Sequence, residues 1–89
     1  MAGTATFATR LKDELIQGLK AAGIDAAVVI EPVQGTKLHR VYVVADAFAN
    51  LRPAERQDLV WRIAAQALSP EEQLQISMIF TVTNEEMPA

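Results

Sequence analysis

The chain carries few side chains that could perform covalent or metal chemistry. His39 is the only histidine and there are no cysteines, so the chain has no thiolate nucleophile, disulfide or thiolate metal site. One neutral imidazole is a poor metal site by itself, since metal sites in proteins usually need several protein ligands. The carboxylate pairs Glu71–Glu72 and Glu85–Glu86 fit a helix start and a solvated tail. We therefore expect no enzyme. His39 is the sole metal candidate, and a half-exposed strand histidine hydrogen-bonded to a neighbour is the favoured interpretation.

A second group of polar side chains lies in and just after the stretch DAFANLRPAERQDLV, residues 46–60. Arg56 stands near the start of an expected helix. It is either a surface arginine with a local salt bridge, for example to Asp46, or the ligand of a partner's carboxylate. Trp61 falls at the boundary between the buried and solvent faces of that helix, where it either covers the edge of the sheet or anchors a partner. These positions indicate binding rather than catalysis.

The composition predicts one small domain over residues 1–89. Hydrophobic residues make up 51% of the chain, which is enough for a single core. The formal net charge is -3 with both signs scattered, which argues against a nonspecific grip on nucleic acid or anionic membrane. No apolar stretch approaches the roughly 20 residues of a membrane span, and the N-terminus does not resemble a secretion signal. We expect a cytoplasmic protein.

The hydrophobic periodicity predicts two helices. Apolar side chains recur every three or four positions at Phe7, Leu11, Leu15, Leu19 and Ala22. Gly23 then supplies a left-handed helix stop. The connection formed by residues 46–52 leads to Pro53 in the first turn of the second helix, whose buried stripe is Leu59, Val60, Ile63, Ala64 and Ala67. Ser69 and Glu72 have capping-box spacing, which predicts one further short helical turn.

Three segments are predicted as strands. Residues 26–31 and 38–45 are rich in valine, and the intervening residues 32–37 form a turn whose most permissive point is Gly35. A longer third strand covers residues 74–83. Its alternate side chains Ile76, Met78, Phe80 and Val82 are expected to share one face. We expect an ordered core over roughly residues 5–84 and a frayed tail over residues 85–89.

The predicted element order is α-β-β-α-β, which is typical of an α+β fold. We expect a two-layer sandwich with a three-stranded mixed sheet and both helices on one face. The second and third strands are joined through a helix, so they are expected to be parallel neighbours.

This order is also that of the BolA-like family, a variant of the type II K-homology topology, and the stretch 46–60 resembles it in detail. BolA-like proteins follow the second strand with Asp-x-Phe-x-Gly and then place Arg-His-Arg, with the first arginine eight residues after the phenylalanine and a valine four residues later. Asp46, Phe48, Arg56 and Val60 occupy those positions without a gap. Near the end, ISMI and TNEEM resemble the family's last strand and the segment after it. The resemblance covers roughly residues 7–87.

The chain departs from the family at the polar positions of this motif. The glycine after the phenylalanine is Asn50, which still tolerates a left-handed turn. The histidine of Arg-His-Arg is Gln57, and the second arginine is Asp58.

The departures include the ligands that the family uses for an iron–sulfur cluster. The histidine of the last strand is replaced by Ser77, or by Gln75 if the register is counted back from Thr83. The second ligand, a histidine or cysteine in the loop between the first two strands, has no counterpart in PVQGTK. His39 lies near that loop, within a residue of a position where family members often carry histidine.

The resemblance implies a non-enzymatic protein that pairs with a monothiol glutaredoxin and acts in iron homeostasis and the stress response. Because the ligands are replaced, we expect no cofactor and no cluster bound in the family manner. We expect docking through the second helix, the loop at 32–38 and the last strand. The candidate partner-binding residues are Gly35, His39, Arg56, Gln57, Trp61 and Ser77.

Two alternatives remain open. One is a DNA-contacting transcription regulator acting through the second helix, where Arg52, Arg56 and Arg62 are diluted by Glu55 and Asp58. The four glycines form no Gly-x-x-Gly clamp of the K-homology kind. The other alternative is a plain protein-interaction domain that shares only the topology, for which self-association through an exposed sheet edge would be the sign.

Overall fold

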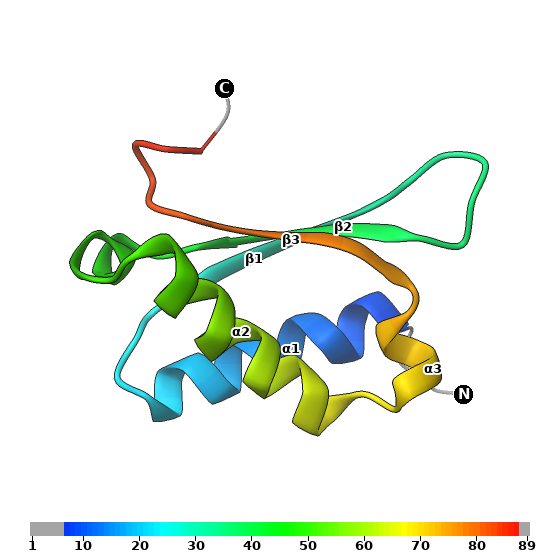
Figure 1. The fold of residues 1–89 in the computed structure, drawn as a ribbon, viewed down its shortest axis with the longest axis horizontal. Helices are drawn as coiled ribbons and strands as arrows, with labels where there is room; N and C mark the ends of the chain where they lie inside the picture. Colours follow the sequence, from blue (N-terminus) through cyan, green and yellow to red (C-terminus); the bar gives the residue numbers. More distant parts are fainter. Residues whose placement is uncertain (1–6, 88–89) are drawn as a thin grey trace.

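The computed structural model describes residues 7–87, which form one sheet and the helices packed on it (Figure 1). The elements in chain order are α1 (Phe7–Ala21), β1 (Ala27–Pro32), β2 (His39–Val44), the 3-10 helix η1 (Asp46–Asn50), α2 (Pro53–Ala67), α3 (Pro70–Gln73) and β3 (Ile76–Val82). The two longer predicted helices and the three strands are confirmed. The predicted strand limits differ from the observed ones by one or two residues. η1 lies in the segment that we expected to be a plain connection.

The sheet has the strand order β1-β2-β3, with β1 and β2 antiparallel and β2 and β3 parallel. α1 and α2 lie on the same face of this sheet, and α3 precedes β3 (Figure 1). The predicted mixed sheet with helices on one face is therefore confirmed. No helix among residues 7–87 is long and apolar enough to cross a membrane.

Local sequence signals account for where the helices begin and end. The backbone N–H of Gly23 donates to Lys20 and that of Ile24 donates to Leu19, both at 2.9 Å. These two bonds form a Schellman motif, and Gly23 takes the left-handed φ of 82° that this motif needs. At α3, the Ser69 hydroxyl accepts from the Glu72 N–H while the Glu72 carboxylate accepts from the Ser69 N–H. The predicted helix stop and capping box are both confirmed.

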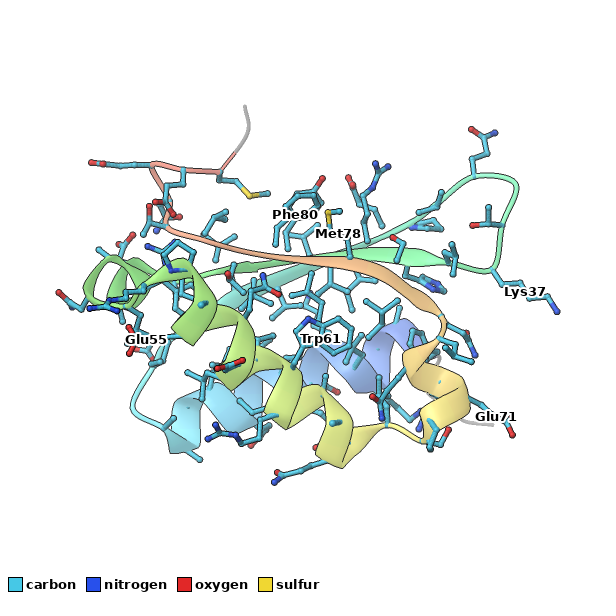
Figure 2. The ribbon with its side chains drawn as sticks, in the orientation of Figure 1. Lys37, Glu55, Trp61, Glu71, Met78 and Phe80 are labelled. Carbon is cyan, nitrogen blue, oxygen red and sulfur yellow. The ribbon has the colours of Figure 1, made fainter. Side chains whose placement is uncertain are left out.

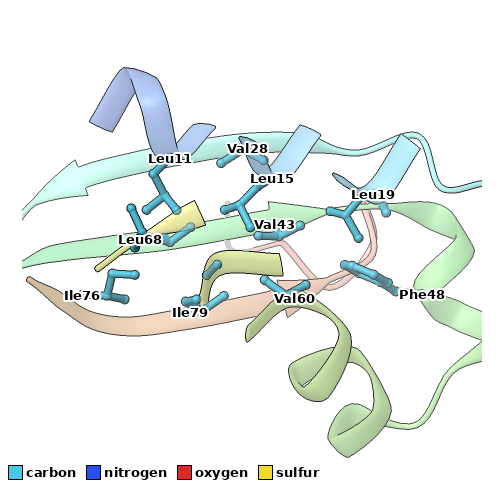
Figure 3. Close-up of a cluster of buried hydrophobic side chains, with 13 residues drawn as sticks. Leu11, Leu15, Leu19, Val28, Val43, Phe48, Val60, Leu68, Ile76 and Ile79 are labelled. Atoms are coloured by element: carbon cyan, nitrogen blue, oxygen red, sulfur yellow. The ribbon is translucent and has the colours of Figure 1, made fainter. Parts of the chain in front are cut away.

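The core lies between the helices and the inner face of the sheet (Figure 3). Leu11, Leu15 and Leu19 of α1 are fully buried, as their spacing predicts. The most deeply buried positions of α2 are Arg56, Val60 and Ala64, of which Val60 and Ala64 were predicted and Arg56 was not. The remaining members of the predicted stripe, Leu59, Ile63 and Ala67, are only partly buried and pack around this core. The buried side of α2 therefore extends to Arg56 in the first turns of the helix.

A β-bulge between β2 and β3 changes which side chains of β3 face the core. His39 pairs with Ile76, but the next residue, Arg40, pairs with Met78, so Ser77 is an extra residue on β3. Ile76 and Ile79 are consequently both buried, while Met78 is 50% exposed. The expectation that Ile76 shares a face with Met78, Phe80 and Val82 is wrong for Ile76, because the extra residue shifts the alternation of the strand.

The chain after β3 forms a hydrogen-bonded turn over residues 83–87. The N–H groups of Glu86 and Met87 both donate to the Thr83 carbonyl at 3.1 Å, and the Glu86 carboxylate accepts from the Thr83 N–H at 2.9 Å. The frayed tail that we expected from residue 85 is therefore not seen through Met87. Residues 5 and 6 of the expected core and residues 88 and 89 of the expected tail lie outside the described residues.

Helices α1 and α2 approach closely at Gly18. A Cβ atom placed on Gly18 would lie 2.6 Å from Cγ2 of Ile63 on α2, so an alanine forces the helices apart. We expect Gly18→Ala to lower the free energy of unfolding by up to about 2 kcal/mol in urea denaturation. Overpacking costs about 1–3 kcal/mol, and the better helix propensity of alanine offsets about 1. In an Ile63→Ala background, which removes the obstructing methyl, the same change should cost little. A stabilising Gly18→Ala would contradict this close approach.

Candidate functional site

Three of the six candidate residues, Gly35, His39 and Ser77, gather at the end of the sheet where β2 and β3 begin. The turn between β1 and β2 is closed by the Val33 N–H donating to the Leu38 carbonyl at 2.9 Å. Gly35 lies exposed at this turn with a left-handed φ of 81°, which favours glycine. We call Gly35, His39 and Ser77 the bulge-end cluster. The sequence placed His39 near the loop between the first two strands, and the fold adds Ser77 at the same end of the sheet.

His39 is half buried at the start of β2. Its ring packs against the Phe7 ring, with centroids 5.2 Å apart and planes tilted by 45°. The buried Nδ1 atom has no hydrogen-bond partner among residues 7–87. The expected strand histidine is therefore found, but the expected hydrogen bond is absent at Nδ1 in the described part of the chain. The aromatic contact with α1 holds the ring instead.

Both residues that the sequence offered in place of the family's strand histidine contact His39 through the backbone. The His39 N–H donates to the Gln75 carbonyl at 2.8 Å, and the exposed Ser77 hydroxyl donates to the His39 carbonyl at 3.1 Å. Ser77 is the extra residue of the bulge, so its side chain is set apart from the regular alternation of β3. A side chain at this position is exposed and adjacent to His39.

Arg56 lies inside the fold, contrary to the expectation of a surface arginine. Its residue exposure is 8%, and its guanidinium lies over the Phe48 ring with Cζ 5.9 Å from the centroid. Its Nε donates to the Leu51 carbonyl at 3.1 Å, and its Nη1 donates to the Thr81 carbonyl at 3.2 Å and to Oε1 of Glu86 at 2.8 Å. The salt-bridge partner is thus Glu86, not Asp46. Asp46 instead accepts from the Asn84 side chain at 2.8 Å.

Gln57 and Trp61 form a short hydrogen-bonded chain from α2 to β3. The Gln57 amide nitrogen donates to the Ile79 carbonyl at 2.8 Å, and its oxygen accepts from the Trp61 indole N–H at 3.2 Å. Both side chains are half buried, and Trp61 packs against the core as the boundary position predicted. Figure 2 shows Trp61 on the side of α2 that faces the sheet. These contacts hold α2 against β3, with both polar ends of the Gln57 amide engaged inside the protein.

The six candidate residues therefore divide by role. The bulge-end cluster presents an open surface, whereas Arg56 and Gln57 make contacts that hold α2 and the turn at residues 83–87 on β3. The contact between Arg56 and Glu86 was not predicted, because the two residues lie 30 positions apart in the chain. Among the described residues, no three histidine, cysteine or acidic side chains are placed to hold a metal ion.

The contacts of Glu86 make part of the stability pH-dependent. The Thr83 N–H and then the Arg56 guanidinium lower the pKa of Glu86 below its ordinary value of 4.5. A lowered folded-state pKa stabilises the fold above pH 4.5, and this contribution is lost as pH falls through the lower folded value. We expect Glu86→Gln to be less stable than wild type at neutral pH, with the difference in unfolding free energy shrinking below pH 4.5.

Urea denaturation at a series of pH values measures this difference. Glu85→Gln, an exposed neighbour, is the matched control. A gap between wild type and Glu86→Gln that stays constant below pH 4.5 would contradict the assignment.

Comparison with known proteins shows a likeness in fold. No protein-family model matches the chain, and no curated protein matches its sequence. Among solved structures, BolA1 from Arabidopsis thaliana superimposes with a TM-score of 0.65 at 20% sequence identity, covering 96% of this chain and 100% of that one. The chain therefore has a BolA-like fold, and the resemblance seen in the sequence is confirmed at the level of the fold.

Proposed function

We propose that this protein is a non-enzymatic docking module that binds a protein partner at the bulge-end cluster. By resemblance to BolA-like proteins, the partner is a monothiol glutaredoxin. The protein would bind it without supplying cluster ligands in the family manner. The observation that carries the proposal is the position of Ser77, exposed at the bulge and bonded to the His39 backbone. The strand histidine of the family would stand there by the alignment, and this chain has a hydroxyl in its place.

The chemistry of the cluster favours docking over cluster ligation. A serine hydroxyl is not among the usual protein ligands of iron–sulfur clusters, which are thiolates and, in some centres, imidazoles. The Ser77 hydroxyl is also committed to a backbone carbonyl. The imidazole of His39 packs on Phe7, with its Nδ1 buried. The exposed β1–β2 turn beside it supplies backbone and side-chain groups that a partner can contact.

The burial of Arg56 bears on the DNA-binding alternative and on the extent of the docking surface. Arg56 is buried, which leaves Arg52 and Arg62 as the exposed arginines of α2. DNA binding through this helix therefore has one fewer basic side chain than the sequence predicted, because only accessible cations can contact phosphates. Arg56 and Gln57 also leave the proposed docking surface, because their polar atoms bind β3. Trp61 is half buried next to Gln57 and forms the border of the docking surface on α2.

A two-part NMR titration tests this proposal. The ¹⁵N-labelled protein is titrated with a monothiol glutaredoxin, first without a cluster and then with one. We expect amide shifts at residues 35–39 and at Ser77 with the apo partner, and no transfer of cluster absorbance to the complex. The control is Arg62→Ala, which removes an exposed charge of α2 and should bind unchanged. No shifts with either form of glutaredoxin would overturn the proposal.

Restoring a histidine at the bulge gives the corresponding gain of function. In Ser77→His, a second imidazole is exposed beside His39, and we expect a mixed complex with glutaredoxin that retains cluster absorbance during gel filtration. Ser77→Ala removes the same hydroxyl without adding a ligand and should retain no cluster. If Ser77→His behaves like Ser77→Ala, then Ser77 does not stand at the family's ligand position.

A further inference from the structure

The face of the sheet opposite α1 and α2 carries no helix among residues 7–87, and only the turn over residues 83–87 rises on that side, at one end (Figure 1). We call this face of the sheet the open face. Its side chains alternate with the core residues of the three strands, and they are Val29, Glu31, Arg40, Tyr42, Met78, Phe80 and Val82. Val29 is 43% exposed and Met78 is 50% exposed. Contiguous apolar surface of this kind marks interaction sites more often than single exposed residues do.

An aromatic pair stands at the centre of this face. Tyr42 and Phe80 are register partners on β2 and β3, and their rings are stacked with centroids 4.8 Å apart and planes 13° from parallel. Figure 2 shows Phe80 and Met78 on the side of the sheet away from Trp61 and α2. Each ring covers one face of the other. The pair is therefore a ridge, not a flat platform for unstacked bases of the kind used by sheet-based RNA-binding domains.

The charges of the open face balance each other. Glu31 and Arg40 are register partners on β1 and β2, about half exposed, with Nε and Oε1 4.0 Å apart. One acid and one base give the face no net charge, and the chain as a whole is at -3. Nucleic acid is thus disfavoured as an occupant. A surface with one charge of each sign is complementary to itself, because a twofold axis can place each charge opposite its counterpart.

We propose that the open face binds a second copy of this chain, sheet against sheet. Packed sheets lie about 10 Å apart with their strands within about 30° of one another. A twofold axis running between β1 and β2 places Arg40 of each copy opposite Glu31 of the other. The side chains of β1 and β2 then meet across the interface, with Tyr42 of each copy opposite Val29 of the other, and the residues of β3 border it.

The size of the face indicates that this dimer is weak. Three strands spaced by about 4.8 Å and about six residues of about 3.3 Å each give a face of roughly 15 by 20 Å. Two such faces together bury an area well below the roughly 1,600 Å² of a standard protein–protein interface. We expect a dissociation constant of about 0.1–1 mM, within the range of transient complexes. At about 20 μM the protein should be monomeric, so this dimer and the proposed glutaredoxin complex can be measured separately.

Sedimentation equilibrium from about 20 μM to about 2 mM tests the dimer. The mean mass of the wild type should rise from 9.7 kDa toward twice that value. Val29→Lys and Tyr42→Lys each place a cation between β1 of one copy and β2 of the other, and both variants should stay monomeric throughout. Leu74→Lys is the matched control, because Leu74 is 77% exposed and lies outside the open face, at the end of α3. It changes the net charge equally and should dimerise as the wild type does.

The charge pair gives a second, independent test. Glu31→Arg alone should abolish the dimer by facing arginine with arginine, and Glu31→Arg with Arg40→Glu should restore it. Thermal unfolding of each variant at low concentration verifies that the monomer remains folded. A wild type that stays at monomer mass up to about 2 mM would overturn the proposal. A dimer that Leu74→Lys weakens while Val29→Lys and Tyr42→Lys leave it intact would do so as well.

Discussion

Replacing Phe48 by alanine should lower the free energy of unfolding by about 3–5 kcal/mol, the usual range for removing a buried phenylalanine. Phe48 is fully buried in η1 at one end of the core (Figure 3) and has the largest volume of the fully buried side chains among residues 7–87. An 89-residue domain is stable by only about 4–13 kcal/mol at ordinary values per residue. The variant should therefore unfold at markedly lower urea concentration, followed by circular dichroism.

Two variants make this result interpretable. Phe80→Ala removes the same atoms from the half-buried open face and should cost much less. Phe48→Leu keeps most of the buried volume and should cost under about 1.5 kcal/mol, which gives a measurement even if Phe48→Ala does not fold. Equal losses for Phe48→Ala and Phe80→Ala would show that Phe48 is not the core residue described here.

Replacing Arg56 by alanine should lower the free energy of unfolding by about 2–4 kcal/mol. The change removes a charged group that donates to the carbonyls of Leu51 and Thr81 and to the carboxylate of Glu86. Breaking a fully buried ion pair costs about 3–5 kcal/mol. The figure here is lower because the side chain of Glu86 is 49% exposed and remains solvated when Arg56 is absent. Urea denaturation of the purified variant measures the loss.

The matched control is Arg62→Ala, an exposed arginine of the same helix, which should cost under about 0.5 kcal/mol. Arg56→Lys keeps the charge but loses the planar guanidinium and its several N–H donors, so most of the loss in unfolding free energy should persist. If Arg56→Ala proves as mild as Arg62→Ala, its buried contacts contribute nothing measurable. Because Arg56 lies over the Phe48 ring, the effects of Phe48→Ala and Arg56→Ala should not be additive.

The sequence predicted the features that depend on local patterns. The leucine stripe of α1, the stop at Gly23 and the capping box at Ser69 each follow from residues within one or two helical turns. The element order then predicted the sheet, because a strand joined to the next through a helix pairs with it in parallel. Trp61 was correctly placed at the border of the core, since it adjoins Val60 on the helical stripe.

The features that the sequence missed depend on distant residues. The bulge at Ser77 arises from the pairing of β3 with β2, and the residues around it give no local sign of an extra position. The burial of Arg56 needs Thr81 and Glu86, which follow it by 25 and 30 residues. Arginine is rarely buried without such partners, so a surface position was the natural expectation. Because we expected Glu86 to lie in a frayed tail, we did not predict its contact with Arg56.

The hydrogen bonds from α2 to β3 also bear on how the chain avoids aggregation. β3 reads ISMIFTV, an uncharged segment of β-branched, aromatic and other apolar residues, and it lies at an edge of the sheet. Such edges are templates on which strands of other molecules can add. Here the carbonyls of Ile79 and Thr81 already accept bonds from Gln57 and Arg56. An incoming strand would have to displace both side chains, so Gln57 and Arg56 protect this apolar edge strand from the addition of other strands.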